Sequence, residues 1–292
     1  MLNRQKSMLS KPSWIRIRWS RDDSYSKVEE MLRDNALRTV CQEARCPNRM
    51  ECWGRGTATF LILGDVCTRR CRFCAVKKGI PGERDASEPF RIARTLREMG
   101  LGHVVITSVT RDDLDDGGAA HFADTVRAIR SLASGCTIEV LIPDFKGSQE
   151  ALKAVINAGP DVIAHNIETV PRLYSQVRPQ ADYHRSLQLL ARVKKDQPAM
   201  KVKSGIMLGF GESIDEVRGV LADLRQSGCD MLTVGQYLQP SGNHFPVIRF
   251  WPPDEFSRLK DEALAAGFSW VESGPLVRSS YRAERPFRQC NA

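Results

Sequence analysis

From residue 58 onward, the sequence alternates between short apolar segments and longer amphipathic ones, which strongly limits the folds that it can adopt. Apolar segments typical of strands lie at Phe60 to Leu63, His103 to Thr107, Thr137 to Ile142, Val162 to Ile167, Met200 to Leu208 and Met231 to Gly235. Helical patterns lie at Pro89 to Met99, Ala119 to Leu132, Ser148 to Asn157, Tyr183 to Lys195, Ser213 to Gln226 and Asp254 to Ala266. This order is expected of βαβ units in a parallel sheet. The sequence therefore predicts an α/β fold, a partial (β/α)6 barrel of the TIM type.

The two ends of the chain fall outside this alternating pattern. The chain has 292 residues, which is enough to bury a large core in one α/β domain with extensions or in two smaller domains. Before the first strand, a basic arm leads into one helical segment, Ser26 to Asn35, with a weak apolar face. We expect residues 1–56 to form an N-terminal extension, residues 57–273 the barrel, and residues 274–292 a C-terminal tail.

Three thiols follow the first predicted strand within eight residues. Cys67, Cys71 and Cys74, which we call the loop cysteines, have the spacing C-x3-C-x2-C. Three closely spaced thiolates suit an iron-sulfur cluster in which one iron stays open to an outside ligand. Zinc is the alternative, but zinc sites usually pair two C-x2-C units or add histidines, and no His lies between Cys41 and Cys74.

A second set of three thiols precedes the barrel. Cys41, Cys46 and Cys52, the triplet cysteines, have the spacing C-x4-C-x5-C in a polar segment rich in turn residues. They form either a second incomplete thiolate site or three buried cysteines that act as small apolar residues. Six of the nine cysteines fall in these two sets, and such clustering favours metal binding over disulfides.

Polar side chains gather where the predicted strands end, which is where parallel α/β barrels carry their active sites. The candidates are Thr107, Ser108, Arg111, Asp112, Asp113, His165, Asn166, Glu168, Lys203 and Ser204. Each has a structural alternative. Asp112 and Asp113 would equally serve as helix caps, and His165 as a core histidine with satisfied hydrogen bonds.

Charge and motif content narrow the classes of function. The net charge of +8 favours acidic partners, either nucleic acid or an acidic protein. No G-x-G-x-x-G motif follows the first strand and no Walker A sequence occurs, so we expect neither a Rossmann nor a P-loop nucleotide site. No segment is long and apolar enough for a membrane helix, and the first twenty residues lack the apolar block of a secretory signal. We therefore expect a cytoplasmic protein with no membrane partner.

The loop cysteines after a first barrel strand resemble the radical S-adenosylmethionine superfamily. Further segments resemble the lipoyl synthase family within it: the triplet cysteines, Ile62 to Cys74, Thr107 to Gly118, His165 to Val170, Lys203 to Gly209, Gly235 to Pro240 and Arg278 to Tyr281. The resemblance covers roughly residues 11 to 284, including Lys11 to Arg16. One departure is Ile142, which stands where the family usually has Thr before Pro-Asp-Phe.

The resemblance implies two 4Fe-4S clusters and S-adenosylmethionine as cofactors. The loop cysteines would bind the cluster that holds S-adenosylmethionine. The triplet cysteines would bind an auxiliary cluster whose fourth ligand is Ser280, and we expect this hydroxyl to be the ligand most easily lost. The residues implied to hold S-adenosylmethionine are Thr107, Ser108, Asn166, Glu168, Lys203 and Ser204. Arg111 is expected near the cluster or the substrate.

The implied reaction is the radical insertion of two sulfur atoms, drawn from the auxiliary cluster, at carbons 6 and 8 of a protein-bound octanoyl-lysine chain. The implied partners are octanoylated lipoyl carrier proteins, namely the glycine cleavage H protein and the acyltransferase subunits of 2-oxoacid dehydrogenases. Ferredoxin or flavodoxin would donate electrons, and iron-sulfur assembly proteins would supply clusters. The rivals are another sulfur-inserting radical enzyme, or a basic metalloprotein that binds nucleic acid through Arg69, Arg70 and Arg72.

Overall fold

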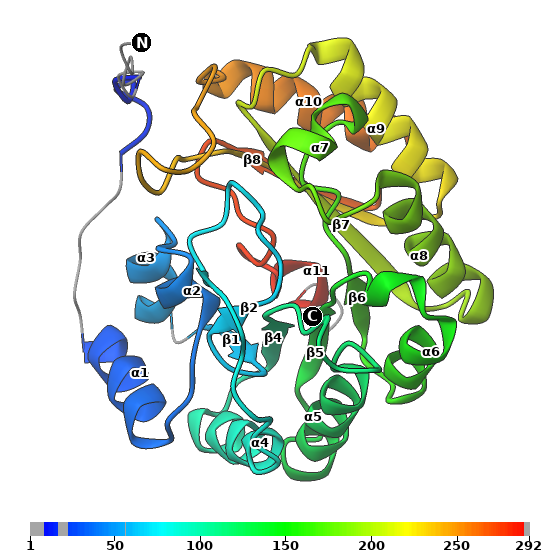
Figure 1. Ribbon diagram of the computed structural model, residues 1–292. Helices are drawn as coiled ribbons and strands as arrows, with labels where there is room; N and C mark the ends of the chain where they lie inside the picture. The colour runs from blue at the N-terminus through cyan, green and yellow to red at the C-terminus, as the bar shows by residue number, and fades with distance from the viewer. Residues whose placement is uncertain (1–8, 17–22, 56, 289–292) are drawn as a thin grey trace.

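The computed structural model describes residues 9–16, 23–55 and 57–288, and its main feature is a seven-stranded parallel sheet (Figure 1). The strand order is β1-β4-β5-β6-β7-β8-β9, and each neighbouring pair is parallel. The strands are β1 (Thr59–Ile62), β4 (His103–Ser108), β5 (Thr137–Leu141), β6 (Val162–Ala164), β7 (Lys201–Leu208), β8 (Met231–Gln236) and β9 (Trp270–Gly274). The α/β partial barrel predicted from the sequence is confirmed.

Helices cover the outer face of this sheet (Figure 1). They are α4 (Glu88–Met99), α5 (Ala119–Leu132), α6 (Gln149–Asn157), α7 (Tyr174–Val177), α8 (Tyr183–Asp196), α9 (Ile214–Gln226) and α10 (Pro253–Ala265). Each long helix turns one apolar face inward, as Ile92 and Leu96 of α4 do, and the strands bury residues such as Ile106 and Val140 against them. The apolar faces of the helices therefore pack against the sheet and complete the core.

The sheet has one more strand than the sequence predicted. β9 is short, and its sequence Trp-Val-Glu-Ser-Gly contains two polar residues and a glycine, so the apolar pattern is too weak to indicate a strand. It pairs in parallel with β8 in the register Leu232 with Val271. The sheet remains open between β1 and β9 in its strand order.

The N-terminal extension lies against β1. It contains α1 (Asp23–Asp34), α2 (Val40–Glu43) and α3 (Arg49–Gly54), and the ring of Tyr25 in α1 lies 5.0 Å from that of Trp53 in α3. Thr39 forms an antiparallel bridge with Phe60, and the Leu61 amide donates to the Arg38 carbonyl at 2.9 Å. These bonds cover the free edge of β1, which would otherwise expose unpaired backbone groups.

The C-terminal tail passes from β9 toward β1 and β4 through the centre of the barrel, where it ends in α11 (Arg285–Arg288) (Figure 1). It passes close to β8 at Gly235, where an added Cβ would overlap the Val277 carbonyl oxygen. The ring of Phe287 stacks on that of His103 in β4 at 5.5 Å. Glycine at position 235 therefore lets the tail lie directly against the sheet.

Three cysteines belong to neither of the two thiol sets. Cys136 and Cys229 are buried in the core, whereas Cys290 lies outside the described residues. Among the helices that the structure describes, none has the length and apolar character needed to cross a bilayer.

Candidate active site

The loop cysteines lie on the segment that follows β1, at the carboxyl end of the sheet. Cys67 ends the short strand β2 (Val66–Cys67), which pairs with β3 (Lys77–Lys78) and closes the base of the loop. The Thr110 amide, just beyond β4, donates to the Cys67 sulfur at 3.3 Å. Cys71 and Cys74, like Cys67, are half-buried and form no disulfide.

Arg69 anchors one side of this loop to the barrel. Its guanidinium donates two hydrogen bonds to Asp112, at 2.7 and 3.0 Å, and one to Asp144 at 2.5 Å. Burial raises the pKa of Asp144, but the hydrogen bond and charge of Arg69 outweigh this effect and lower it to about 2. Asp112 therefore pairs with the loop and Asp113 pairs with Arg111 at 2.8 Å, so neither serves as a helix cap.

The segment after β8 anchors the other side. The Phe245 amide donates to the Arg72 carbonyl at 2.8 Å, and His244 Nε2 lies 3.1 Å from the Cys74 carbonyl oxygen. The Arg72 guanidinium also lies over the Phe245 ring at 5.2 Å. The loop is thus fixed between the ends of β4 and β8, while its thiols stay accessible.

A cavity of about 510 Å³ opens at the carboxyl ends of the strands, beside the loop cysteines. Its size suits a ligand of the dimensions of a nucleoside. The lining joins both thiol sets, because it includes Cys41, Cys46, Cys67, Cys71, Cys74 and Ser280. The rest of the wall alternates apolar residues, such as Leu141 and Ile142, with polar ones.

Four of the six residues expected to hold S-adenosylmethionine line this cavity: Thr107, Ser108, Asn166 and Glu168. The Ser108 hydroxyl and the Asn166 amide oxygen are buried, and neither has a hydrogen-bond partner among the described residues. Buried polar atoms are nearly always paired in folded proteins. These two atoms therefore indicate where a polar ligand would bind.

Lys203 and Ser204 lie outside the cavity lining, in the interior of the barrel. Lys203 Nζ donates to both carboxylate oxygens of Glu139, at 2.8 and 2.9 Å, and both residues are buried. Ser204 donates to the His165 carbonyl at 2.9 Å. Their hydrogen-bonding capacity is used within the core, so we leave both out of the proposed ligand contacts.

His165 lines the cavity, but its ring is buried and its hydrogen bonds are satisfied, as the structural alternative predicted. Its Nδ1 donates to the Ile142 carbonyl at 2.8 Å and its Nε2 lies 2.9 Å from the Ser186 hydroxyl. Burial lowers the pKa of His165 to about 4. The side chain is therefore neutral at physiological pH, and it fixes the end of β5 against α8.

Glu168 is a half-buried carboxylate of the cavity wall. Its φ of +67° is unusual for a residue with a side chain, and hydrogen bonds to Gly205 and Met207 of β7 hold this conformation. Burial raises the pKa of Glu168, while the nearby Arg178 and a hydrogen bond from Asn166 at 3.1 Å oppose the rise. A carboxylate in this position would suit a cationic ligand group.

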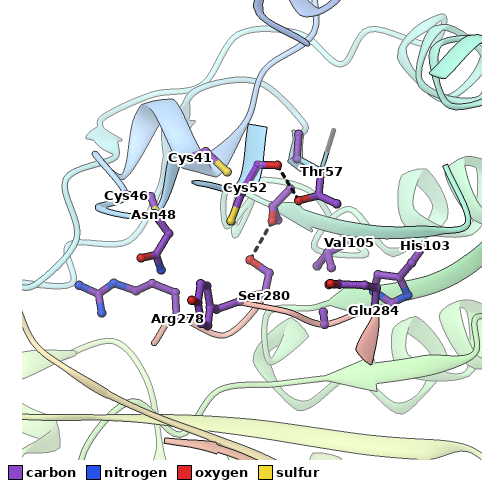
Figure 2. Close-up of a pocket in the computed structure, with 14 residues that line it drawn as sticks. Cys41, Cys46, Asn48, Cys52, Thr57, His103, Val105, Arg278, Ser280 and Glu284 are labelled. Atoms are coloured by element: carbon purple, nitrogen blue, oxygen red, sulfur yellow. Dashed lines mark hydrogen bonds between the residues drawn. The ribbon is translucent and has the colours of Figure 1, made fainter. Parts of the chain in front are cut away.

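The triplet cysteines and Ser280 meet beside the start of β1. Figure 2 shows the sulfur atoms of Cys41 and Cys52 and the Ser280 hydroxyl pointing toward the same space, and Cys46 also lines it. Residues 41 to 52 belong to the N-terminal extension and Ser280 belongs to the tail. The fold therefore brings together groups more than 200 residues apart.

Three side-chain hydrogen bonds fix the tail at this position. Asn48 Nδ2 donates to the Leu276 carbonyl at 2.7 Å, Thr59 Oγ1 donates to Ser280 Oγ at 2.8 Å, and the Tyr281 hydroxyl donates to Glu51 at 3.1 Å. The three bonds involve α3, its N-terminal flank and β1. The tail is thus held before and after Ser280 as well as at Ser280 itself.

Burial changes the protonation equilibrium of five thiols in the two sets. Burial raises the pKa of Cys41 to about 11 and that of Cys74 to about 12, and it also raises the pKa of Cys46, Cys52 and Cys71. In the absence of a metal, these groups are therefore protonated near neutral pH. Metal binding favours thiolates and releases these protons.

Comparisons with known proteins relate this geometry to a family. The model of the radical SAM superfamily matches residues 61–224. A lipoyl synthase of Acidithiobacillus ferrooxidans is 56% identical over 282 residues, which cover 96% of this chain and 89% of that protein. A lipoyl synthase of Caldanaerobacter subterraneus is 54% identical over 274 residues, which cover 94% of this chain and 96% of that protein. The chain belongs to the lipoyl synthase family.

Solved structures of lower identity share the fold of this lipoyl synthase family member. Methylornithine synthase aligns with a TM-score of 0.54 at 18% identity, covering 85% of this chain and 81% of that one. Streptococcus suis SuiB bound to S-adenosylmethionine aligns with a TM-score of 0.56 at 11% identity, covering 77% of this chain and 54% of that one. At these identities the likeness shows the fold alone.

Membership of the lipoyl synthase family implies two 4Fe-4S clusters and S-adenosylmethionine, and the donor groups fit them. Each thiol set offers three sulfurs, and the cavity beside the loop cysteines offers two unpaired polar atoms. Within the described residues, no three His, Cys, Asp or Glu side chains converge as the ligands of a single metal ion do. Cluster thiolates bind different irons and need not converge in that way.

Sequence reasoning missed several residues that shape this lipoyl synthase site. Thr59 lies just before the predicted strand Phe60 to Leu63 and had no assigned role, and Arg178 had none although it lines the cavity. Arg278 lines both the cavity and the smaller pocket of the triplet cysteines. The position of Arg69 between two of the loop cysteines indicated that it lies near the site. Its partner Asp144 could not be identified in this way, because it follows a strand that is distant in the sequence.

Proposed function

We propose that this protein is a lipoyl synthase that inserts two sulfur atoms at carbons 6 and 8 of an octanoyl chain linked to a lysine of a carrier protein. The observation that supports this most directly is the shared cavity, whose lining includes all three loop cysteines, two triplet cysteines and Ser280. A substrate in this cavity contacts both sites without leaving the protein. One site alone would serve radical formation but not sulfur insertion.

The residues of this chain hold the cofactors and shape the space between them. The loop cysteines hold one 4Fe-4S cluster, and the triplet cysteines with Ser280 hold the other. When bound, the clusters and S-adenosylmethionine supply the electron, the radical and the sulfur for the reaction. Ser108 and Asn166 offer unpaired polar atoms to S-adenosylmethionine, and Glu168 offers a carboxylate to its ammonium group.

The cavity wall also has a role toward the octanoyl chain. Val109, Leu141, Ile142 and Leu238 form apolar parts of the lining, and such surface accommodates an alkyl chain while excluding water. The two carbons that react are unactivated, so no acid or base of the protein could open their C-H bonds. The contribution of the protein is therefore positioning and exclusion of water.

Ser280 is the proposed catalytic residue. A hydroxyl is a poorer ligand for iron than a thiolate, so Ser280 would be the most easily released of the four ligands. This property suits a cluster that gives up its sulfur.

We further propose an acidic electron donor, a ferredoxin or flavodoxin, and resupply of the auxiliary cluster by iron-sulfur assembly proteins. Two exposed basic residues of the cluster loop, Arg70 and Arg72, support docking of an acidic donor. The reaction is assigned to the cytoplasm, because its reducing conditions keep both thiol sets free for iron.

The test is mass spectrometry of an octanoyl-lysine peptide after anaerobic incubation with the reconstituted protein, S-adenosylmethionine and a reductant. We expect a product that carries two added sulfurs. Formation of 5'-deoxyadenosine without sulfur insertion would contradict the proposed substrate while leaving the superfamily assignment intact. Bound zinc in place of about eight irons per chain would contradict both cluster assignments.

A further inference from the structure

Thr59 is the first residue of β1, and its hydroxyl faces the end of the C-terminal tail. Its Oγ1 donates a hydrogen bond of 2.8 Å to Ser280 Oγ, which Figure 2 draws as a dashed line reaching Ser280. The side chain is only 5% exposed, and the backbone pairs with Val105 of β4. The donor is therefore rigid and shielded from water.

Ser280, the other residue of this bond, does not lie in a helix or strand. Ser280 lies in an irregular turn of the tail, followed by Arg282 with a φ of +54°. A ligand on an irregular segment holds its position only if neighbouring groups fix it. Asn48 and Tyr281 restrain the backbone on either side, but Thr59 contacts the ligand oxygen itself.

Two hydroxyls can form this bond in either direction, so its role follows from the 2.8 Å contact between Thr59 Oγ1 and the proposed ligand oxygen. A hydrogen bond donated by Thr59 to Ser280 Oγ would hold that oxygen in place beside the cluster. Donors and acceptors that contact metal ligands typically change metal affinity by about 10-fold to 100-fold. Thr59 suits this role, because its Oγ1 lies 2.8 Å from Ser280 Oγ and can donate to that oxygen when it binds iron.

We propose that Thr59 is a positioning residue that stabilises Ser280 as the fourth ligand of the auxiliary cluster. This inference rests on the proposed function, in which Ser280 binds that cluster. The binding of Ser280 to iron then depends on a residue of the barrel as well as on the tail. Retention of the auxiliary cluster thus depends on contact between β1 and the tail.

The experiment measures iron loss to a chelator from the full chain after anaerobic reconstitution. Cys67→Ala, Cys71→Ala and Cys74→Ala are present throughout, so that only the auxiliary cluster contributes. We expect Thr59→Val to lose iron about 10-fold faster than the parent, and Thr59→Ser, which keeps the donor, to lose it at the parent rate. Thr125→Val is the matched control, because it removes a buried threonine hydroxyl whose one hydrogen bond within the described residues goes to the His121 carbonyl of α5, at 2.7 Å.

A second pair of variants separates this inference from the proposed function. In a Ser280→Ala background, Thr59→Val should add less than about a two-fold effect, because the oxygen it stabilises is gone. A full effect in that background would show that Thr59 acts through another contact, either strand packing or its hydrogen bond to Cys41, and would overturn the inference. Parent-rate iron loss by Thr59→Val together with fast loss by Ser280→Ala would also overturn it, with the function intact. Parent-rate loss by Ser280→Ala itself would overturn both the inference and the role proposed for Ser280 as a cluster ligand.

Discussion

Arg69 and Asp112 are joined by two parallel hydrogen bonds of 2.7 and 3.0 Å, which tie the loop of Cys67 and Cys71 to the end of β4. Arg69 also bonds Asp144, so one guanidinium bridges two carboxylates. A lysine ammonium cannot reproduce this fork. The loop should therefore lose its fixed conformation when Arg69 is replaced by lysine, which keeps the positive charge but not the fork of donors.

The corresponding prediction concerns Arg69→Lys. We expect bound iron to fall from about eight to about four atoms per chain. The free energy of unfolding should fall by about 1 to 3 kcal/mol, since a buried carboxylate loses one of its charged partners. Iron analysis and thermal unfolding would measure both changes. Arg70→Lys, in the same loop but with an exposed side chain, is the control and should retain all the iron. An Arg69→Lys protein with a full iron content would contradict the anchoring role.

Sequence analysis located the cysteine sets and most of the strand ends because both signals are local. Thiol spacing and apolar runs are read within a few residues, and parallel strands bring their carboxyl ends to one edge. Lys203 was expected at the ligand site, and there is a physical reason why the structure places it outside the cavity lining. A polar residue on a barrel strand can line the cavity or lie deeper in the barrel. For Lys203 the deeper position follows from its bond to Glu139, which the local sequence does not reveal.

Contacts between distant segments were beyond sequence reasoning for the same reason. Thr59 and Ser280 are 221 residues apart, and no local pattern in either segment indicates the other. β9 was missed because its short sequence is half polar. The resemblance to a family supplied Ser280 as a ligand, but only the folded tail shows which residues surround it.

Gly235→Ala should displace the tail from β8. The added methyl group would overlap the backbone oxygen of Val277, and backbone moves less easily than a side chain. We expect the free energy of unfolding to fall by about 1 to 3 kcal/mol and the auxiliary cluster to lose occupancy, because Ser280 lies three residues beyond the contact. The control is Gly219→Ala on the exposed face of α9, where an added Cβ meets no atom within 4 Å. It should be neutral or stabilising by up to about 1 kcal/mol, and equal effects of the two variants would contradict the prediction.

His165 should make stability depend on pH below neutrality. Burial lowers its pKa to about 4 in the folded protein, compared with about 6.5 in the unfolded chain. Above pH 6.5 both states hold a neutral ring, so the residue has no effect. As the pH falls from about 6.5 to about 4, only the unfolded state takes up the proton, and stability is lost.

The size of this loss is about 1 kcal/mol between pH 7 and pH 5.5 and about 3 kcal/mol in full. Thermal unfolding of the parent and of His165→Gln over this range would measure it. The variant is expected to be less stable at every pH but to show a shallower decline. His184→Gln removes an exposed histidine and should leave the slope of the parent unchanged. An identical slope for His165→Gln would mean that other groups cause the decline.

Ser280→Cys should bind its cluster more tightly and turn over more slowly. A thiolate is a stronger ligand for iron than a hydroxyl, so the release that sulfur donation requires becomes harder. We expect slower iron loss to a chelator together with a sulfur insertion rate reduced at least about 10-fold, which corresponds to about 1.4 kcal/mol in the barrier. Insertion at the parent rate would show that release of this ligand does not limit the reaction.

The net charge of +8 leads to a final prediction, on the carrier protein. Lipoyl carriers are expected to be acidic, and attraction between exposed charges weakens as salt shortens the Debye length from about 10 Å at 0.1 M. Raising the salt from about 0.05 to 0.3 M should therefore increase the KM for an octanoylated carrier by about 3-fold to 10-fold, with little change in kcat. A short octanoyl-lysine peptide without acidic residues is the matched substrate, because it enters the same cavity without the carrier surface. The KM for this peptide should not change with salt concentration. If the KM for the carrier protein does not change either, charge does not guide docking.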